Sequence, residues 1–443
     1  MKITIIGTGY VGLVSGACLS SKGHYVTCVD NNTVKIKSLL KGECPIYEAG
    51  LEDLLEDNTR LSFSSDLFES CKETDAIMIC VGTPFKDNKI DLSYLINVSN
   101  EIGNILKKLN RYIVVIVKST VIPGTTENVV GSLISDVSGK EIGKDFGIGM
   151  NPEFLREGVA VNDFMNPDRI VLGGNDRNSI EVMKGIYSDF SSANVITTNC
   201  STAEMIKYTS NSFFATLISF SNEIANFCSE IKGVDSSDVI KGLISDRRIT
   251  TKKDQKITTP DLVSYLNPGC GFGGSCFPKD VQSIISLGND LGANMKILEA
   301  VVSVNNSQPK KVIDLLYKAF ANTDNLNIGV LGLSFKPGTD DIRESASIKI
   351  IIELLSMNIK VTAHDPISIN ITKDAVSHPN LEFNNDISEI ISKSDGVILA
   401  TEWDQYTELP KMINSLNPNL KLIDGRRFFT KDSVKNYYGI GLG

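Results

Sequence analysis

The chain begins with a short apolar run that is followed at once by three closely spaced glycines. Lys2–Ile6 is typical of a buried β-strand, and Gly7, Gly9 and Gly12 continue it as G-x-G-x-x-G. In a strand–turn–helix unit, the first glycine permits a tight turn, the second lets the backbone approach a pyrophosphate, and the third allows close helix packing. Phosphate oxygens then lie at a helix N-terminus, where N–H groups and the helix dipole favour negative charge. The motif predicts a dinucleotide-binding, Rossmann-like fold.

The second predicted strand, Tyr25–Asp30, supports this reading because it ends in a carboxylate. Asp30 follows Gly12 by eighteen residues. A carboxylate at this place accepts hydrogen bonds from ribose hydroxyls and repels a 2′-phosphate, so NAD is favoured over NADP. The alternative is a glycine-rich turn with a surface aspartate.

Short apolar strands alternate with helical periodicity at both ends of the chain, which is typical of doubly wound parallel sheets. The expected strands are Lys2–Ile6, Tyr25–Asp30, Ala76–Val81, Tyr112–Lys118, Phe146–Met150, Asn327–Leu331, Lys360–His364, Gly396–Thr401 and Lys421–Asp424, and the first helices are expected at Val11–Lys22 and Leu92–Leu109. The order of elements repeats: KITIIGTGYVG is similar to NIGVLGLSFKPG, YVTCVDNN to KVTAHDPI, and DAIMICVGTP to DGVILATEW.

Between these halves, the sequence from about Ser201 runs for some thirty residues without proline and without glycine until Gly233. Ser201 or Thr202, with Glu204 nearby, is the expected N-cap of a helix that bridges two domains and offers a dimerisation face. The predicted fold is α/β, with two Rossmann-like doubly wound domains joined by a long central helix. The predicted domains are an NAD-binding domain (1–200), a central helical domain (201–310) and a second Rossmann-like domain (311–443).

Composition narrows the class of protein. The 443 residues are too many for one ordinary core, and a net charge of −9 without a basic block gives no sign of nucleic acid as the main partner. Apolar runs are too short to span a bilayer and no signal peptide is evident, so a cytoplasmic protein with no membrane partner is expected. The nine cysteines form no C-x-x-C pair. Reduced thiols are therefore expected, with neither a disulfide framework nor a metal site.

One cysteine lies in an unusual setting. The segment PGCGFGGSCFPKD, residues 268–280, places four glycines around Cys276. Pro278 fits the first turn of a helix that continues through Val281–Leu287, so Cys276 is expected at a helix N-terminus. The dipole there lowers a thiol pKa. The alternative is a buried structural cysteine in a turn.

A thiolate gives a dehydrogenase access to a second oxidation. An aldehyde carbon does not readily lose hydride, because the product would be an unstabilised acyl cation. Addition of a nucleophile makes a tetrahedral carbon that can expel hydride and leave an acyl-enzyme, which water then releases as an acid. A cysteine of this kind in a chain with an NAD motif suggests oxidation beyond the aldehyde.

The motifs together resemble those of the UDP-glucose/GDP-mannose dehydrogenase family, over nearly the whole chain. The segments that carry the resemblance are GTGYVG (7–12), VGTP (81–84), KSTVIPGTT (118–126), NPEFLREG with NPDRIVLGG (151–174), EMIKYTSNSF (204–213), GFGGSCFPKD (271–280) and FKPGTDDIRES (335–345). The resemblance implies an NAD-dependent, two-step oxidation of a sugar nucleotide, with UDP-glucose giving UDP-glucuronate through a cysteine thiohemiacetal and thioester. It also implies a homodimer through the central helix.

The resemblance assigns roles to matching residues. Cys276 resembles the nucleophile, Lys207 the group that stabilises the oxyanion, and Asn211 a substrate-orienting amide one turn away on the same helix face. Asp280 resembles the carboxylate that, with Lys207, holds a water for general-base work, and Thr120 and Glu157 orient that water. Without the resemblance, Lys207 reads as an ordinary solvated helix lysine.

The resemblance also implies contacts to the two ligands. Those expected at the cofactor are Gly7, Gly9, Tyr10, Val11, Gly12, Asp30, Lys35, Thr83, Thr120, Glu157, Lys279 and Arg343. Those expected at the sugar nucleotide are Glu153, Phe154, Leu155, Arg156, Lys207, Asn211, Arg248, Phe272, Gly273 and Lys336. Lys336 and Arg343 resemble phosphate or uridine contacts, which supply local positive charge in an acidic protein. For Thr83 the alternative is a simple strand-ending turn.

Two features depart from the family pattern. Asp246-Arg247-Arg248-Ile249 matches a segment that contributes an arginine to the neighbouring subunit's sugar site, but a polar insertion within 250–267 lengthens the spacing to the cysteine loop. This insertion is either a surface loop or a change in the dimer contact. Cys270 is also unexpected in the loop, and it is either neutral or a redox-sensitive partner of Cys276.

Other functions remain open at this level. GDP-mannose and UDP-N-acetylmannosamine are the nearest alternative substrates, although NPEFLREG followed by NPDRIVLGG is most similar to the UDP-glucose group. A single-step hydroxyacid dehydrogenase, which uses a lysine and no cysteine, would yield one NADH per substrate and not two. A non-catalytic binding protein on the same scaffold is disfavoured because Cys276, Lys207 and Asp280 are all present.

Overall fold

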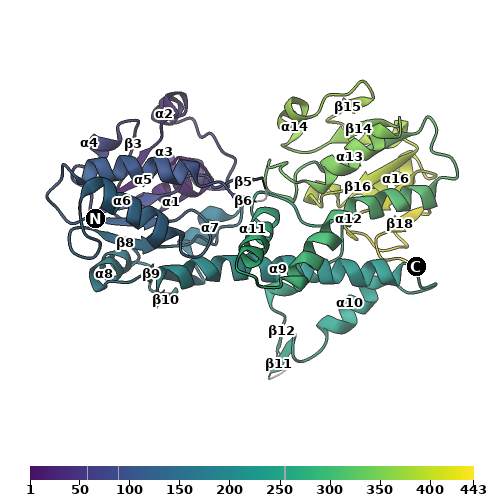
Figure 1. The fold of residues 1–443 in the computed structure, drawn as a ribbon. Helices are drawn as coiled ribbons and strands as arrows, with labels where there is room; N and C mark the ends of the chain where they lie inside the picture. Colours follow the sequence, from purple (N-terminus) through teal and green to yellow (C-terminus); the bar gives the residue numbers. More distant parts are fainter. Residues whose placement is uncertain (57, 88, 254–255) are drawn as a thin grey trace. The chain divides into compact units, whose positions relative to one another are not determined.

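The computed structural model describes residues 1–56, 58–87, 89–253 and 256–443. Contacts within it cluster into two compact units, Met1–Ser210 and Asn211–Gly443. Each unit is built around its own β-sheet, and helix α9 (Cys200–Cys228) crosses the boundary without interruption (Figure 1).

The N-terminal unit has an eight-stranded sheet in the order β10-β9-β8-β7-β4-β1-β2-β3. Its strands are β1 (Lys2–Ile6), β2 (Tyr25–Val29), β3 (Leu61–Ser64), β4 (Ala76–Ile79), β7 (Val114–Val117), β8 (Gly147–Met150), β9 (Arg169–Gly174) and β10 (Asn194–Thr198). Its helices are α1 (Tyr10–Ser21), α2 (Thr33–Leu40), α3 (Leu51–Glu56), α4 (Leu67–Cys71), α5 (Ser93–Leu106), α6 (Ser132–Ser138), α7 (Ala160–Met165) and α8 (Arg177–Ile186). A short hairpin, β5 (Phe85–Lys86) with β6 (Lys89–Ile90), and a π-helical turn at Thr126–Gly131 complete the unit.

The C-terminal unit has a six-stranded sheet in the order β15-β14-β13-β16-β17-β18, in which every described pairing is parallel. Its strands are β13 (Asn327–Leu331), β14 (Lys360–His364), β15 (Leu381–Phe383), β16 (Gly396–Leu399), β17 (Lys421–Asp424) and β18 (Tyr437–Gly439). Its helices, besides most of α9, are α10 (Ser236–Ile244), α11 (Phe277–Asp290), α12 (Lys296–Ala319), α13 (Ala346–Ser356), α14 (Ile369–Ala375), α15 (Ile387–Lys393) and α16 (Leu409–Leu416).

The two sheets share one connectivity. Reading β1, β2, β3, β4, β7 and β8 as strands 1 to 6 gives the order 3-2-1-4-5-6, and β13 to β18 give the same order. This order is that of doubly wound dinucleotide-binding folds. The predicted repeat, with two Rossmann-like domains linked by a long helix, is confirmed.

One part of the N-terminal sheet differs from the expected parallel arrangement. Strand β9 pairs with β8 in the antiparallel sense, and β10 then pairs with β9 in parallel. Strand β9 was not among the expected strands, and its residues lie within the NPDRIVLGG motif. The NPEFLREG segment lies in the connection between these two antiparallel strands.

Alternating side chains bury both faces of the central strands, as expected for sheets covered by helices on both sides. On β4, Ala76 and Met78 join a core with α1, whereas Ile77 and Ile79 join a second core with α5 and α6. The C-terminal sheet does the same: Val330 on β13 packs with α12 and α13, and its neighbour Leu331 packs with α15 and α16.

The start of α9 differs from the prediction. The side chain of Asn199 accepts a hydrogen bond from the Thr202 backbone N–H at 2.8 Å, so Asn199 caps the helix in place of Ser201 or Thr202. Glu204 reaches elsewhere: its carboxylate accepts from the backbone N–H groups of Gly124 and Thr126. These partners are distant in sequence, and no local pattern indicated them.

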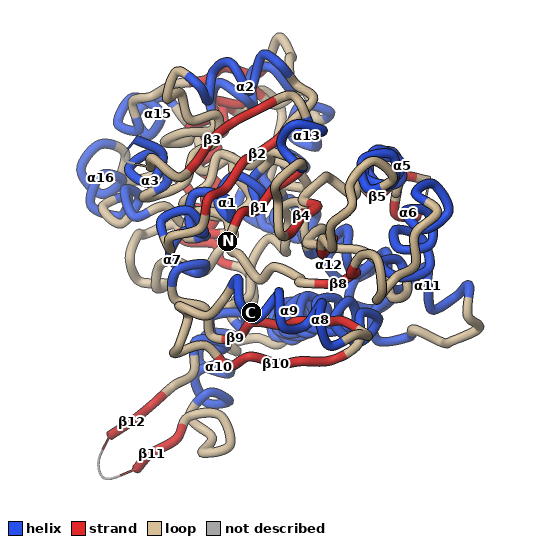
Figure 2. The backbone as a smooth tube through the Cα atoms, turned by 90° about the vertical axis from the view of Figure 1, so that its left-hand side faces the viewer, coloured by secondary structure: helices blue, strands red, loops and turns tan. Residues whose placement is uncertain are grey.

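The insertion within 250–267 contains two elements. Strands β11 (Thr251–Lys253) and β12 (Lys256–Thr258) pair as an antiparallel hairpin, and a 3₁₀ turn covers Asp261–Leu266. Figure 2 shows the two strands side by side. Residues 254 and 255 of the insertion lie outside the described residues.

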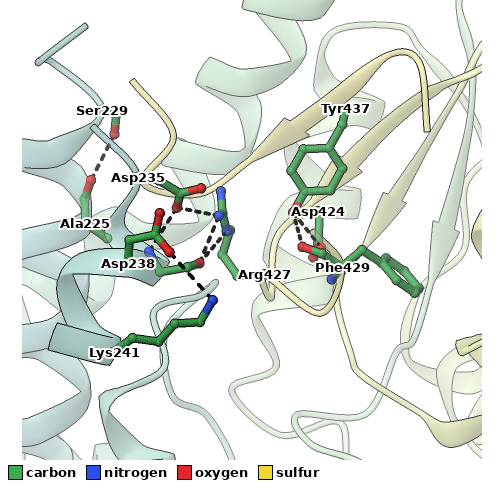
Figure 3. Close-up of polar contacts among 10 residues, drawn as sticks. Ala225, Ser229, Asp235, Asp238, Lys241, Asp424, Arg427, Phe429 and Tyr437 are labelled. Atoms are coloured by element: carbon green, nitrogen blue, oxygen red, sulfur yellow. Dashed lines mark hydrogen bonds and ion pairs between the residues drawn. The ribbon is translucent and has the colours of Figure 1, made fainter. Parts of the chain in front are cut away.

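A buried ion pair ties α10 to the C-terminal strands. Arg427 follows β17 and donates to the Asp235 carboxylate at 2.5 Å and to the Ser237 hydroxyl (Figure 3). Asp424 accepts from the Tyr437 hydroxyl and the Phe429 N–H, both at 2.9 Å.

No helix in the described part of the chain has the length and apolar character needed to cross a membrane.

Candidate functional site

In the glycine turn between β1 and α1, the fold requires glycine at two positions but not at the third. Gly7 has a left-handed φ of +98°, and a Cβ on Gly12 would lie 1.9 Å from the Gly7 carbonyl oxygen. Gly9 is the N-cap of α1, at an ordinary φ of −71°, and a Cβ there would have no described atom within 4 Å. Nothing described fills the space in front of Gly9, as a pyrophosphate site at a helix N-terminus requires.

Asp30, directly after β2, lies against this turn. One carboxylate oxygen accepts from the Thr8 N–H at 2.9 Å and the Thr8 hydroxyl at 2.8 Å, and the other accepts from the Asn32 N–H at 2.9 Å. Burial alone would raise the pKa of Asp30, but these hydrogen bonds and the Lys35 ammonium, at 4.0 Å, hold the pKa below its ordinary value. Asp30 is thus an ionised acceptor beside the proposed cofactor turn.

Tyr10 of the motif anchors the NPEFLREG segment. Its hydroxyl donates to the Glu48 carboxylate and accepts from the Gly158 N–H at 2.8 Å. Glu48 is buried and also accepts from the Gly158 and Val161 N–H groups. Burial raises the pKa of Tyr10, so the phenol stays protonated as a donor. Sequence reasoning missed Glu48, because no local motif marks a carboxylate whose partners all lie far away in the sequence.

Two strand ends in the N-terminal sheet are joined by side chains. The Thr83 hydroxyl donates to the Thr120 carbonyl at 2.7 Å, and the Ser119 hydroxyl donates to the Val81 carbonyl at 2.6 Å. These bonds hold the segments after β4 and β7 together. Thr83 and Thr120, both predicted at the cofactor, therefore lie side by side.

Lys207 is a buried lysine and not a solvated one. Its ammonium lies 2.8 Å from the Glu153 carboxylate, and the two side chains are 4% and 7% exposed. Burial would raise the pKa of Glu153, but the charge and hydrogen bond of Lys207 and the Leu155 N–H hold the pKa below its usual value. The Phe154 ring lies 5.5 Å from the Lys207 ammonium. Removing one partner of such a buried pair costs about 3–5 kcal/mol.

The rest of the NPEFLREG segment is more open. Arg156 is exposed and makes a bidentate contact with Asp163, at 2.7 and 3.0 Å. Leu155 and Glu157 are half-buried. The structure thus brings Glu153 and Phe154 to Lys207 and turns Arg156 toward the surface.

The cysteine loop ends where α11 begins, as predicted. Cys276 occupies the N-cap position, Pro278 lies in the first turn, and the Asp280 N–H donates to the Cys276 carbonyl at 2.8 Å. The Cys276 thiol is half-buried and lies 3.5 Å from the Ser275 hydroxyl. A thiol at a helix N-terminus faces free N–H groups and the positive end of the dipole, which favour the thiolate.

Asp280 is fully buried one turn after the cysteine. Its carboxylate accepts from the Asn211 amide at 2.6 Å and pairs with the Lys279 ammonium at 2.5 Å. Three predicted residues therefore form one hydrogen-bonded group. Asn211 comes from α9, so this group also fixes α11 against that helix.

The cysteine loop packs on the FKPGTDDIRES segment within the C-terminal unit. The Gly274 N–H donates to the Arg343 carbonyl at 2.8 Å, and a Cβ on Gly273 would lie 2.4 Å from the Glu344 carbonyl oxygen. Arg343 is held by Asp341 in a bidentate contact, at 2.7 and 2.8 Å. The Lys336 ammonium lies 5.9 Å from the centre of the Phe335 ring. The FKPGTDDIRES segment, which carries the predicted phosphate or uridine contacts, is thus packed directly on the cysteine loop.

Arg426 is a residue that sequence reasoning missed. Its guanidinium donates to the carbonyls of Ala400 at 2.6 Å, Phe335 at 3.3 Å and Gly271 at 3.4 Å. It therefore links the end of β16, the FKPG segment and the cysteine loop. Its only local signal was its place after a strand, in DGRR.

The two departures from the family pattern concern Arg248, which precedes the insertion, and Cys270, and these residues lie in different settings. Arg248 is 87% exposed and pairs with Asp246 at 2.7 Å; its hydrogen bonds hold the pKa of Asp246 at about 2. The Cys270 thiol is buried, donates to the Gly425 carbonyl at 3.1 Å, and has a pKa raised to about 11 by burial. None of the nine cysteines is in a disulfide. The described residues also hold no cluster of three or more His, Cys, Asp or Glu suited to a metal.

A glycine turn with an adjacent carboxylate in one Rossmann-like unit, and a thiol at a helix N-terminus in the other, define an NAD-dependent dehydrogenase. Three matches to family domains cover most of the chain. They are the NAD binding domain (residues 1–191), the central domain (201–307) and the UDP binding domain (329–431) of the UDP-glucose/GDP-mannose dehydrogenase family. The chain belongs to this family, and its cofactor is NAD.

Individual relatives agree with this assignment. The UDP-glucose 6-dehydrogenase of Rickettsia bellii is 40% identical over 100% of this chain and 99% of its own length. A UDP-glucose dehydrogenase from Pyrobaculum islandicum has a similar structure, with a TM-score of 0.90, 35% identity and coverage of 100% and 98% of the two chains. A UDP-D-ManNAc dehydrogenase from Pyrococcus horikoshii is less similar, with a TM-score of 0.83, 25% identity and coverage of 100% and 99%.

Proposed function

We propose that this chain is a UDP-glucose 6-dehydrogenase, which oxidises the primary alcohol of the glucose to a carboxylate in two steps. The observation that carries the proposal is the place of Cys276, a half-buried thiol at the N-terminus of α11. Similarity to relatives that bear this name supports UDP-glucose over UDP-N-acetylmannosamine as the substrate.

The N-terminal unit has the features that NAD needs. Gly9 leaves space at the start of α1 for a pyrophosphate, and Asp30 is an ionised acceptor for ribose hydroxyls. Tyr10, Val11, Lys35, Thr83 and Thr120 surround these elements in our proposal, and Glu157, Lys279 and Arg343 complete the set. When bound, NAD accepts a hydride from the sugar carbon in each oxidation.

Cys276 makes the second oxidation possible. After the first oxidation, the thiolate adds to the aldehyde carbon: a carbon–sulfur bond forms and the carbonyl oxygen becomes an alkoxide, which takes up a proton. The resulting thiohemiacetal carbon can lose hydride while its hydroxyl loses a proton, which leaves a thioester on Cys276. Water then adds, the carbon–sulfur bond breaks, and the carboxylate and the Cys276 thiolate are released.

Other polar groups stabilise charge and move protons in this scheme. We assign Lys207 to the developing alkoxide, because a fixed cation stabilises negative charge formed in the transition state. Asn211 orients the sugar, and Asp280, with Lys207, holds the attacking water and accepts its proton. Thr120 and Glu157 orient the same water.

We assign the remaining predicted residues to binding the sugar nucleotide. Those in the N-terminal unit are Glu153, Phe154, Leu155 and Arg156, and those in the C-terminal unit are Arg248, Phe272, Gly273 and Lys336. We assign Arg248 to the sugar site of a neighbouring subunit. We also propose the three-domain division at 1–200, 201–310 and 311–443, and a cytoplasmic location.

A homodimer is supported by an apolar stripe on α9. Phe213, Phe220 and Phe227 follow one another at intervals of seven residues and are 50%, 49% and 65% exposed. Residues seven apart lie on one face of a helix, and apolar residues at this spacing pack well against a second helix. Sedimentation of the protein, compared with a Phe220→Glu variant, tests whether this stripe holds two copies together.

The experiment that tests the reaction is the NADH yield per molecule of sugar nucleotide consumed. UDP-glucose should yield two NADH and UDP-glucuronate, whereas GDP-mannose and UDP-N-acetylmannosamine should react far more slowly. A yield of one would identify a single-step dehydrogenase, and no turnover with any of the three would refute the proposal.

A further inference from the structure

The backbone of the cysteine loop is held at one residue by a single amide side chain. Asn305, on α12, accepts a hydrogen bond from the Phe272 N–H at 2.7 Å and donates one to the Phe272 carbonyl at 3.0 Å. Asn305 is buried, so these bonds are shielded from water. One carboxamide thus satisfies both backbone groups of a residue that has no place in a helix or sheet.

The neighbouring residues are shaped around this contact. Gly271 has a φ of +96°, and a Cβ on it would lie 2.6 Å from the Asn305 amide oxygen. Asn222, a fully buried residue of α9, accepts from the Gly269 N–H at 2.7 Å. The loop is therefore fixed to two helices just before Gly273 and Gly274.

A short segment links this fixed point to the thiol. Gly273 and Gly274 follow Phe272, and both are buried against the FKPGTDDIRES segment, so they have little room to absorb a shift of the chain. Only three residues separate Phe272 from Cys276. A shift of the chain at Phe272 is therefore transmitted directly to the start of α11, where the thiol lies.

We infer that Asn305 is a positioning residue that holds the Phe272–Cys276 segment and thereby fixes the thiol at the N-terminus of α11. The inference rests on the proposed role of Cys276. Asn305 acts through the backbone of the loop, and its carboxamide is suited to the task because it both donates and accepts without carrying charge.

The same helix offers a matched control. Gln308 lies one turn after Asn305 and is fully buried. A Cβ on Gly271 would lie 3.3 Å from the Gln308 Cβ. Among the described residues, neither its amide oxygen nor its amide nitrogen has a hydrogen-bond partner. Gln308→Met removes a buried amide beside the same glycine and keeps nearly the same volume, but it removes no bond to the loop.

Three measurements on full-length Asn305→Ala, Asn305→Asp and Gln308→Met test the inference. Hydrogen exchange of the peptide containing Phe272 reports the bond to the Phe272 N–H. Alkylation of Cys276 by iodoacetamide, followed by peptide mass spectrometry without any ligand, reports the setting of the thiol. The third measurement is kcat and KM with UDP-glucose and NAD.

For Asn305→Ala we expect about tenfold faster exchange at Phe272, a changed alkylation rate, and a kcat lowered on the order of 100-fold, with a smaller change in KM. Gln308→Met should resemble the unmodified protein in all three. In Asn305→Asp, the ionised carboxylate can accept from the Phe272 N–H but repels the Phe272 carbonyl, whereas the protonated carboxyl can both accept and donate. The protection of Phe272, corrected for the pH dependence of intrinsic exchange, should therefore rise as pH falls. A variant with a merely structural defect would not show this pH-dependent recovery.

Unchanged exchange, alkylation and kcat in Asn305→Ala would overturn the inference. So would equal losses in Gln308→Met, since they would trace the effect to packing of α12. If Asn305→Ala does not fold, Asn305→Asp decides, and absence of recovery at low pH counts against the inference. If the unmodified protein fails to oxidise UDP-glucose, the proposed function fails, while exchange and alkylation still decide the role of Asn305.

Discussion

The two Rossmann-like units use one architecture for different purposes. Both have the strand order 3-2-1-4-5-6, and both have a glycine with a left-handed φ after the first strand, Gly7 at +98° and Gly332 at +89°. Each glycine donates its N–H to the carbonyl of the last residue of the second strand, Val29 or His364, at 2.8 Å. An aspartate follows that strand in both units, Asp30 in one and Asp365 in the other.

The two units differ in whether a helix begins at the glycine turn and in how many hydrogen bonds the aspartate accepts from the protein. After β1, helix α1 begins at Tyr10, so its N-terminus lies at the turn; after β13, the chain forms a loop until α13 begins at Ala346. Asp365 accepts from the backbone N–H groups of Leu333, Ser334, Ile367 and Ser368, from the Ser368 hydroxyl and from the Trp403 ring N–H.

Asp30 accepts from only three described groups, on Thr8 and Asn32. The carboxylate of the N-terminal unit therefore has fewer partners within the protein, and we proposed it as a ligand of NAD, whereas the matching carboxylate of the C-terminal unit holds its own turn. The longer loop after β13 instead packs on the cysteine loop through Arg343 and Glu344. A repeat in sequence thus establishes a common scaffold, but the hydrogen-bond partners decide which copy can bind a dinucleotide.

The largest expected effect is a loss of turnover in a variant of the C-terminal unit that leaves NAD binding by the N-terminal unit unchanged. Cys276→Ala should lower formation of the acid by about 1,000-fold or more, because the covalent intermediate is lost. NAD affinity, measured by fluorescence titration, should stay near normal, since the glycine turn is untouched. Undiminished UDP-glucuronate formation by this variant would refute the role of Cys276 as the nucleophile.

A second comparison lies within the glycine turn. Gly12→Ala places a Cβ 1.9 Å from a backbone oxygen, and overpacking of this kind should destabilise the unit by about 3 kcal/mol. Gly9→Ala meets no described atom within 4 Å and should leave the melting temperature almost unchanged, while NAD affinity falls about tenfold. Thermal unfolding and NAD titration of both variants test this. Equal melting temperatures, or full NAD affinity in Gly9→Ala, would contradict the division of roles.

The third prediction concerns acid stability of the C-terminal unit. Burial would raise the pKa of Asp235, but the hydrogen bonds of Arg427 and of the Ser237 N–H hold it below its usual value. A carboxylate with a depressed folded pKa stabilises the protein above its unfolded pKa, about 3.9, and loses that contribution as pH falls through the folded pKa.

Asp235→Asn should therefore lower stability at pH 7 by about 2 kcal/mol, because Arg427 keeps a buried charge without its counter-ion. The difference from the unmodified protein should shrink below about pH 4. Thermal unfolding from pH 3 to pH 7 measures it. A difference that is constant across this range would show that the loss is one of packing.

The architecture could be predicted because strand–helix alternation and the repeated motifs depend on residues that are close together in the sequence. The same holds for Cys276 at a helix start, since Pro278 and the glycines before it signal that boundary. Long-range partners could not be predicted. Burial of Lys207 depends on Glu153, and the fixing of the loop depends on Asn305 and Arg426, whose contacts are made only after the chain has folded.

The smallest effect tests the pair of aspartates directly. Asp30→Asn should weaken NAD binding about tenfold, because the amide offers the ribose a poorer acceptor than an ionised carboxylate, which makes hydrogen bonds about twice as strong. Asp365→Asn should leave NAD affinity unchanged but lower the melting temperature more, since an amide nitrogen would face backbone donors that now meet a carboxylate oxygen. NAD titration and thermal unfolding of both variants give a two-by-two comparison. If Asp365→Asn also weakens NAD binding while Asp30→Asn does not, the functional asymmetry assigned to the two units is reversed, and the hydrogen-bond partners of these carboxylates do not decide which copy holds the cofactor.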